Sequence, residues 1–126
     1  MKVFVTGGAG FIGSNFIRHV LAWRKEYSVV NYDKLTYAGN LANLAPVAGN
    51  PQYRFVKGDI CDPSAVEAAM QGCDSVVHFA AESHVDRSIY EPDAAIETNV
   101  TGTFVLLQVA QKLGIKRFVQ IGRAHV

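Results

Sequence analysis

The fold of this chain is decided by residues 2–13, which read KVFVTGGAGFIG. The run from Lys2 to Thr6 is mostly β-branched or aromatic and stops at a pair of glycines, which is typical of a short buried strand. From Phe11 onward the apolar residues recur at four-residue spacing, as on one face of a helix. The stretch therefore predicts a strand, a tight glycine turn and a helix in immediate succession.

The glycines of this turn have the spacing of a phosphate-binding loop. Gly8, Gly10 and Gly13 form G-x-G-x-x-G, and Gly7 with the last two forms G-x-x-G-x-x-G. In such a loop one glycine permits the sharp turn, one lets the backbone approach a pyrophosphate, and one lets the helix pack against the strand. The N-terminus of the helix then presents free N–H groups to the phosphates. A tight turn that binds no ligand would contain the same glycines, so the surrounding sequence has to decide.

Asp33 supplies the second half of this signal. It follows the apolar run from Tyr27 to Tyr32, which predicts a second strand, and it lies about 20 residues after Gly13. A carboxylate in this position accepts hydrogen bonds from the hydroxyls of an adenosine ribose. It also favours NAD over NADP because it repels a 2′-phosphate, although Lys34 beside it could neutralise that phosphate. The glycine turn and Asp33 together predict a dinucleotide-binding site.

Strands and helices continue to alternate along the chain. We expect the helices at residues 11–25, 63–71 and 92–113 and the later strands at residues 53–57, 74–79 and 116–121. Residues 34–50 are expected to form a long polar connection. The last helix carries an apolar stripe made of Ile96, Val100, Phe104 and Leu107. The alternation predicts an α/β fold with a Rossmann-type, doubly wound parallel sheet, truncated after about the fifth strand and spanning residues 1–121.

Further polar residues follow the predicted strand ends. Asp59 could bond an adenine amine, or it could cap a helix or remain solvated. The segment from Glu82 to Ser88 is rich in reactive side chains, but it lacks a nucleophile motif. We expect His78 to be a satisfied core histidine and His19 to lie on the surface, so the histidines offer no metal site.

Composition excludes several classes of protein. The chain has 126 residues, of which 49% are hydrophobic, and a net charge of +1, so we expect neither disorder nor a nucleic-acid partner. Its two cysteines, Cys61 and Cys73, form no CxxC pair and suit a reducing compartment. Neither a signal peptide nor a run of about 20 apolar residues is present, so we expect a cytoplasmic protein.

Several longer strings carry a family resemblance. They are TGGAGFIG at residues 6–13, DKLTYAGNL at 33–41, DICD at 59–62, AAESHVDRSI at 80–89, and ETN at 97–99 followed by GT at 102–103. With these strings the chain resembles the extended short-chain dehydrogenase/reductases and, within them, the dTDP-glucose 4,6-dehydratases. The resemblance covers nearly the whole chain.

The resemblance implies NAD as cofactor and a set of contacts to it. Phe11 and Ile12 would lie at the pyrophosphate, the run from Asp33 to Thr36 at the adenosine ribose, and Asp59 with Ile60 at the adenine. Residues 79–83 would line the nicotinamide, with Ser83 also touching the substrate sugar. The full set of implied cofactor contacts is Gly7, Gly10, Phe11, Ile12, Gly13, Asp33, Lys34, Leu35, Thr36, Asp59, Ile60, Phe79, Ala80, Ala81, Glu82, Ser83 and Thr98.

The resemblance also implies a reaction and an assembly. In that family hydride leaves C4 of dTDP-glucose for NAD, water is eliminated across C5 and C6, and hydride returns to C6. The enzymes are hydro-lyases, and their product is dTDP-4-keto-6-deoxyglucose. The helix that begins at Pro92 would pack against its counterpart in a homodimer. A related nucleotide-sugar epimerase or decarboxylase, or a non-catalytic module that senses a dinucleotide, are the alternatives.

The last residues depart from the family pattern. The family continues after its fifth strand with Ser-Thr-Asp-Glu and later Tyr-x-x-x-Lys, whereas residues 120–126 here read QIGRAHV. We therefore expect no catalytic residue and no substrate domain within residues 1–126, and no dehydratase activity from this stretch alone. The string at 121–126 matches the translation of a common sequencing adapter, so residues 122–126 are expected to be a non-native tail rather than a divergent native one.

Overall fold

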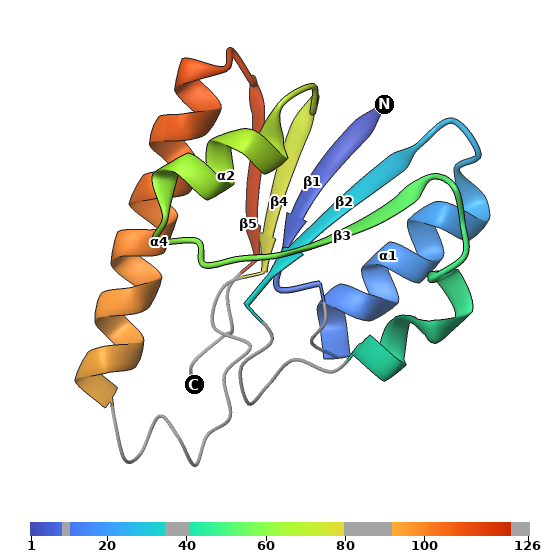
Figure 1. The fold of residues 1–126 in the computed structure, drawn as a ribbon, viewed down its shortest axis with the longest axis horizontal. Helices are drawn as coiled ribbons and strands as arrows, with labels where there is room; N and C mark the ends of the chain where they lie inside the picture. Colours follow the sequence, from blue (N-terminus) through green and yellow to red (C-terminus); the bar gives the residue numbers. More distant parts are fainter. Residues whose placement is uncertain (9–10, 35–40, 80–91, 122–126) are drawn as a thin grey trace.

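Five strands lie side by side in one parallel sheet (Figure 1). The chain is described by a computed structural model at residues 1–8, 11–34, 41–79 and 92–121. The strands are β1 (Lys2–Thr6), β2 (Ser28–Asp33), β3 (Tyr53–Lys57), β4 (Ser75–Phe79) and β5 (Arg117–Ile121). Their order across the sheet is β3-β2-β1-β4-β5, and every neighbouring pair is parallel. The predicted parallel sheet is confirmed, with strand ends within one residue of those expected.

Helices cover both faces of this sheet. They are α1 (Phe11–Trp23), the 3-10 helix η1 (Leu41–Val47), α2 (Pro63–Met70) and α4 (Pro92–Lys112). Figure 1 shows α1 and η1 together on one side of the sheet and α2 and α4 together on the other. The side chains of β1 alternate between the two layers: Val3 and Val5 pack with Ile17 of α1, while Phe4 packs with Leu106 of α4. The described residues thus form a doubly wound sheet, as the sequence predicts.

The helix ends differ slightly from the predicted ones. Helix α1 ends at Trp23, two residues early, so Arg24 and Lys25 lie beyond it. Asp62 caps α2 as predicted, since its carboxylate accepts the Ala65 N–H at 3.3 Å. The predicted connection at residues 34–50 was wrong in part, because it contains η1.

Three of the four residues in the apolar stripe predicted for α4 point away from the core, and the side chain of the fourth, Ile96, lies outside the described part of the chain. Val100, Phe104 and Leu107 are 65%, 59% and 48% exposed, whereas the buried face of the helix presents Leu106 and its neighbours. Val119 and Ile121 are also exposed, because β5 is the edge strand of the described sheet. No helix within the described ranges is long and apolar enough to cross a membrane.

Candidate cofactor-binding site

The carboxyl ends of four neighbouring strands meet at one edge of the sheet. Thr6 at the end of β1 pairs in register with Tyr32 of β2 and with His78 of β4, and Asp33 pairs with Lys57 of β3. The glycine turn that follows β1 and the carboxylate that ends β2 therefore lie at the same edge. In open parallel α/β sheets, ligands bind at this edge, at the point where the sequence order of the strands reverses. In this sheet that point lies between β1 and β4.

The backbone of the glycine turn leaves no space for side chains. Gly7 has φ = +72°, and a Cβ there would lie 2.5 Å from the carbonyl oxygen of Phe79. A Cβ on Gly13 would overlap the carbonyl oxygen of Gly7, so the first turn of α1 packs directly on the loop. A Cβ on Gly8 would overlap the side chain of Asn31 on β2. The positive φ of Gly7 and the close packing at Gly13 agree with the turning and helix-packing roles that the spacing predicts, while Gly10, expected at the pyrophosphate, lies outside the described residues.

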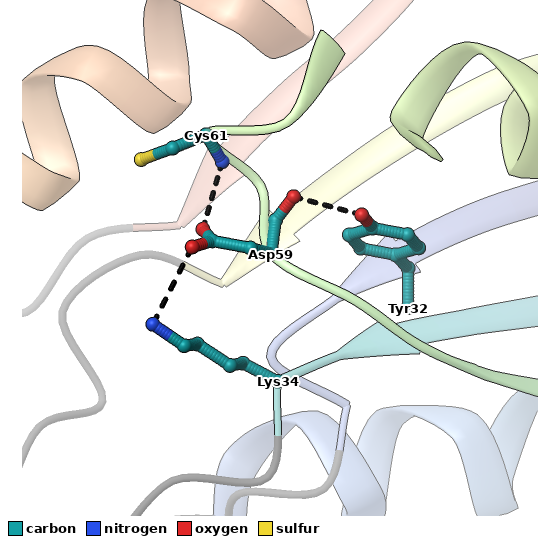
Figure 2. Close-up of polar contacts among 4 residues, drawn as sticks. All are labelled: Tyr32, Lys34, Asp59 and Cys61. Atoms are coloured by element: carbon teal, nitrogen blue, oxygen red, sulfur yellow. Dashed lines mark hydrogen bonds and ion pairs between the residues drawn. The ribbon is translucent and has the colours of Figure 1, made fainter. Parts of the chain in front are cut away.

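A second polar cluster joins the ends of β2 and β3 (Figure 2). Lys34 Nζ lies 3.4 Å from Asp59 Oδ2, and Asp59 Oδ1 accepts the backbone N–H of Cys61 at 2.9 Å. The Cys61 N–H, and to a smaller extent the Lys34 ammonium, lower the pKa of Asp59. Asp59 is therefore an anionic group at the edge where the sequence predicts the adenosine end of a cofactor.

Tyr32 fixes the backbone that carries this carboxylate. Its hydroxyl donates to the carbonyl oxygen of Asp59 at 2.7 Å, and a Cβ on Gly58 would overlap that hydroxyl. Burial, with the nearby charges of Asp62 and Asp59, raises the pKa of Tyr32 to about 12, so the phenol remains a donor. Tyr32 is a residue of this site that was not predicted from the sequence. The signal for it was an aromatic residue directly before Asp33 combined with the glycine before Asp59.

Helix α4 packs against Ile60, the residue that follows Asp59 in the sequence. A Cβ on Gly102 would overlap the Ile60 side chain, so the helix and the turn after β3 are in van der Waals contact. Phe79 is buried at the end of β4, and its ring centroid lies 5.4 Å from that of Phe16 on α1. The predicted site residues Asp59, Ile60 and Phe79 are thus brought to the same edge as Asp33.

Among the remaining predicted site residues, Ile12 lies within the described part of the chain. Ile12, on the first turn of α1, is 54% exposed. The expected contacts that lie outside the described residues, or whose side chains do, are Gly10, Phe11, Leu35, Thr36, Ala80, Ala81, Glu82, Ser83 and Thr98. The reactive segment from Glu82 to Ser88 lies outside them as well.

The two histidines examined as candidate ligands have the environments that the sequence predicts. His78 is buried within β4 and bonds hydroxyl groups of Thr6 and Thr103 through its two ring nitrogens. His19 is exposed on α1. Within residues 1–8, 11–34, 41–79 and 92–121, no group of three or more His, Cys, Asp or Glu side chains is arranged to hold a metal ion.

The comparison with known families agrees with this geometry. A family model described as GDP-mannose 4,6 dehydratase matches residues 4–126. The chain belongs to the GDP-mannose 4,6 dehydratase family.

Individual relatives refine the placement within the GDP-mannose 4,6 dehydratase family. The dTDP-glucose 4,6-dehydratase of Shigella flexneri is 56% identical over 113 residues, which are 88% of this chain and 31% of the relative. The structure of the dTDP-glucose 4,6-dehydratase from Streptomyces venezuelae, solved with NAD bound, is 52% identical with a TM-score of 0.86 over 94% of this chain and 38% of that one. The UDP-glucose 4-epimerase of Thermotoga maritima shares 34% identity and a TM-score of 0.80, over 95% of this chain and 37% of its own. The chain spans 31–40% of the length of the curated relatives it matches.

Proposed function

We propose that this chain is the cofactor-binding part of an NAD-dependent dTDP-glucose 4,6-dehydratase. The observation that carries the proposal is the meeting of the glycine turn, Asp33 and Asp59 at one sheet edge. The comparisons favour a dehydratase, because identity is 38–56% to dTDP-glucose 4,6-dehydratases and 27–34% to the epimerases.

The described residues fit a dinucleotide. Helix α1 begins at Phe11, directly after the glycine turn, and the N-terminus of a helix is a favourable place for a phosphate. Carboxylates end β2 and follow β3, so they lie on neighbouring strands, where one would meet the ribose and the other the base of an adenosine. The result is a polar edge whose described residues include no group of three or more His, Cys, Asp or Glu side chains arranged to hold a metal ion.

Each residue has a proposed part in binding. The Asp33 carboxylate accepts hydrogen bonds from the adenosine ribose hydroxyls, and the Asp59 carboxylate accepts from the adenine amine while Ile60 covers the ring. The Gly7–Gly13 turn receives the pyrophosphate, and Phe79 supports that turn from behind. Bound NAD supplies a reversible hydride acceptor. Ala80 to Ser83 and Thr98 are proposed to complete the nicotinamide end, and Ser83 to contact the substrate sugar.

The rest of the reaction is assigned to other parts of the full-length protein. The general base for the C4 hydroxyl and the acid and base for elimination are proposed to lie outside residues 1–126. We further propose a cytoplasmic homodimer, with nucleotide sugar as substrate and no nucleic-acid partner, since the net charge is +1.

Two measurements on the full-length gene product test the proposal. Calorimetric titration should show saturable NAD binding, and incubation with dTDP-glucose should give the 4-keto-6-deoxy product. UDP-glucose is the control substrate. Interconversion of UDP-glucose and its C4 epimer without a 4-keto product would identify the epimerase alternative, and absence of NAD binding would exclude both enzymes.

A further inference from the structure

Lys34 is a cation at this edge that could pair with the 2′-phosphate of NADP. It directly follows Asp33, beside the expected position of the adenosine ribose, and its side chain is 59% exposed. A 2′-phosphate on that ribose carries a charge of about −1.5 to −2 and pairs well with an ammonium group. In the structure, however, the Lys34 ammonium is directed at the carboxylate of Asp59, 3.4 Å away (Figure 2).

The carboxylate of Asp59 is held in place without the help of Lys34. One of its oxygens accepts the Cys61 N–H at 2.9 Å, and its main-chain carbonyl accepts the Tyr32 hydroxyl at 2.7 Å. Most exposed ion pairs contribute little because two long side chains have to be ordered together. Here only the lysine has to be ordered, since its partner is short and already fixed.

The charges at this corner follow from that pairing. Asp33 ends β2, Lys34 directly follows it, and Lys57, which pairs with Asp33 in register, ends β3 two residues before Asp59. A 2′-phosphate that recruited Lys34 would have to separate it from Asp59 and would leave that carboxylate without its nearest ammonium partner.

We propose that Asp59 is a specificity-determining residue that maintains the preference for NAD over NADP by holding Lys34 away from the 2′-phosphate position. This inference rests on the proposed function, because it presumes that a dinucleotide binds at this edge. It assigns to Asp59 a role beyond its expected contact with adenine, and to Lys34 a role in the choice between NAD and NADP beyond its expected contact with the adenosine ribose.

The expected effect is small but measurable. Both side chains are partly exposed, so the pair should contribute in the range measured for surface ion pairs. Release of Lys34 should therefore raise the affinity for NADP relative to NAD by about two- to fivefold.

The test compares the ratio of NADP to NAD affinities among variants of the full-length gene product, by calorimetric titration at low ionic strength. Asp59→Asn removes the charge and retains an oxygen that can accept the Cys61 N–H. Asp59→Asn combined with Lys34→Gln removes the released lysine. Asp62→Asn is the matched control: it removes a carboxylate three residues away, and asparagine caps a helix as well as aspartate does.

Each outcome decides the inference. It is supported if the ratio rises in Asp59→Asn, returns to the wild-type value in the double variant and is unchanged in Asp62→Asn. Asp59→Asn weakening both dinucleotides equally would overturn it and leave only the adenine contact. An equal rise in Asp62→Asn would also overturn it, because the cause would then be general charge. If the wild-type protein bound neither dinucleotide, the proposed function itself would fail, which is a distinct result.

Discussion

His78 on β4 and Thr103 on α4 are joined by a hydrogen bond, with 3.1 Å between the histidine Nε2 and the threonine hydroxyl oxygen. The other ring nitrogen bonds the hydroxyl of Thr6 on β1. A neutral imidazole has one donor and one acceptor nitrogen, so it satisfies both hydroxyl groups. The ring is 2% exposed, and burial lowers its pKa to about 4. Protonation would place a positive charge in this buried position, so the folded protein favours the neutral ring that connects two strands and a helix.

The first prediction is a loss of stability in mild acid. The pKa of His78 in the folded protein lies below the ordinary value of 6.5. The unfolded chain therefore takes up a proton first as the pH falls. The contribution of neutral His78 to the free energy of unfolding is fully present above about pH 6.5. It is lost progressively as the pH falls toward 4, by roughly 3 kcal/mol. Urea unfolding of the gene product at several pH values measures this slope.

Two variants make this measurement specific. His78→Gln should flatten the pH dependence between pH 6.5 and 4, whereas His19→Gln, at an exposed position on α1, should leave the slope unchanged. A slope that is identical in wild type and His78→Gln would contradict the prediction.

The second prediction concerns the carboxylate at the end of β2. Asp33→Ala should lower NAD affinity by about tenfold to a hundredfold, because a hydrogen bond to a charged group contributes roughly 1.5–3 kcal/mol. It should also reduce the preference for NAD over NADP. Calorimetric titration measures both, with Glu26→Gln, which removes an exposed carboxylate before β2, as the control. Equal NAD affinities in Asp33→Ala and wild type would rule out the ribose contact.

The third prediction uses two glycines with opposite surroundings. A Cβ on Gly13 would overlap the Gly7 carbonyl oxygen, whereas nothing lies within 4 Å of a Cβ on Gly49. Gly13→Ala should therefore lower the free energy of unfolding by about 1–3 kcal/mol. It should also displace the start of α1, with loss of NAD binding. Gly49→Ala should change stability by no more than about 0.5 kcal/mol. Chemical denaturation and NAD titration test both variants, and an unchanged NAD affinity in Gly13→Ala would contradict the proposed phosphate site.

The fourth prediction is that residues 1–126 expressed alone self-associate. The exposed apolar side chains of α4 and β5 supply the surface for this association, and β5 also offers an open edge. Changing Phe104 and Leu107 together to Gln should reduce association, measured by sedimentation velocity, without lowering the unfolding midpoint. Leu106→Gln, on the buried face, should instead destabilise the fold by about 3 kcal/mol. A monomeric wild-type stretch with a cooperative melting transition would refute the prediction.

The features predictable from the sequence were those set by local pattern. The strand before Gly7, the helix after it and the carboxylate of Asp33 depend on residues close together in the chain, and the structure has them in the predicted places. Helix η1 escaped prediction because it is short and contains Pro46, and its buried residues Leu44 and Val47 are too few to define a period.

Other features depend on contacts between distant residues. The pairing of Lys34 with Asp59 requires β2 and β3 to be neighbours in the sheet, and no local sequence motif predicts that strand order. Helix α4 is apolar on two faces, so its periodicity indicated a helix but did not identify the face containing Leu106 as the one that packs on the sheet. The role of Tyr32 likewise depends on the neighbouring strand, because its hydroxyl donates to Asp59 in the turn after β3.

The strand order has a consequence for how the chain assembles during synthesis. Strands β2 and β3 add successively to one side of β1, so the first three strands can pair as they emerge. The opposite side of β1 waits for β4, whose pairing partners lie 72 residues away, as in the contact of Thr6 with His78. Until then β1, which is buried from Val3 to Thr6 in the folded sheet, keeps one row of N–H and C=O groups unpaired. The nascent chain is therefore most vulnerable to mispairing between the release of residue 6 and the arrival of residue 75.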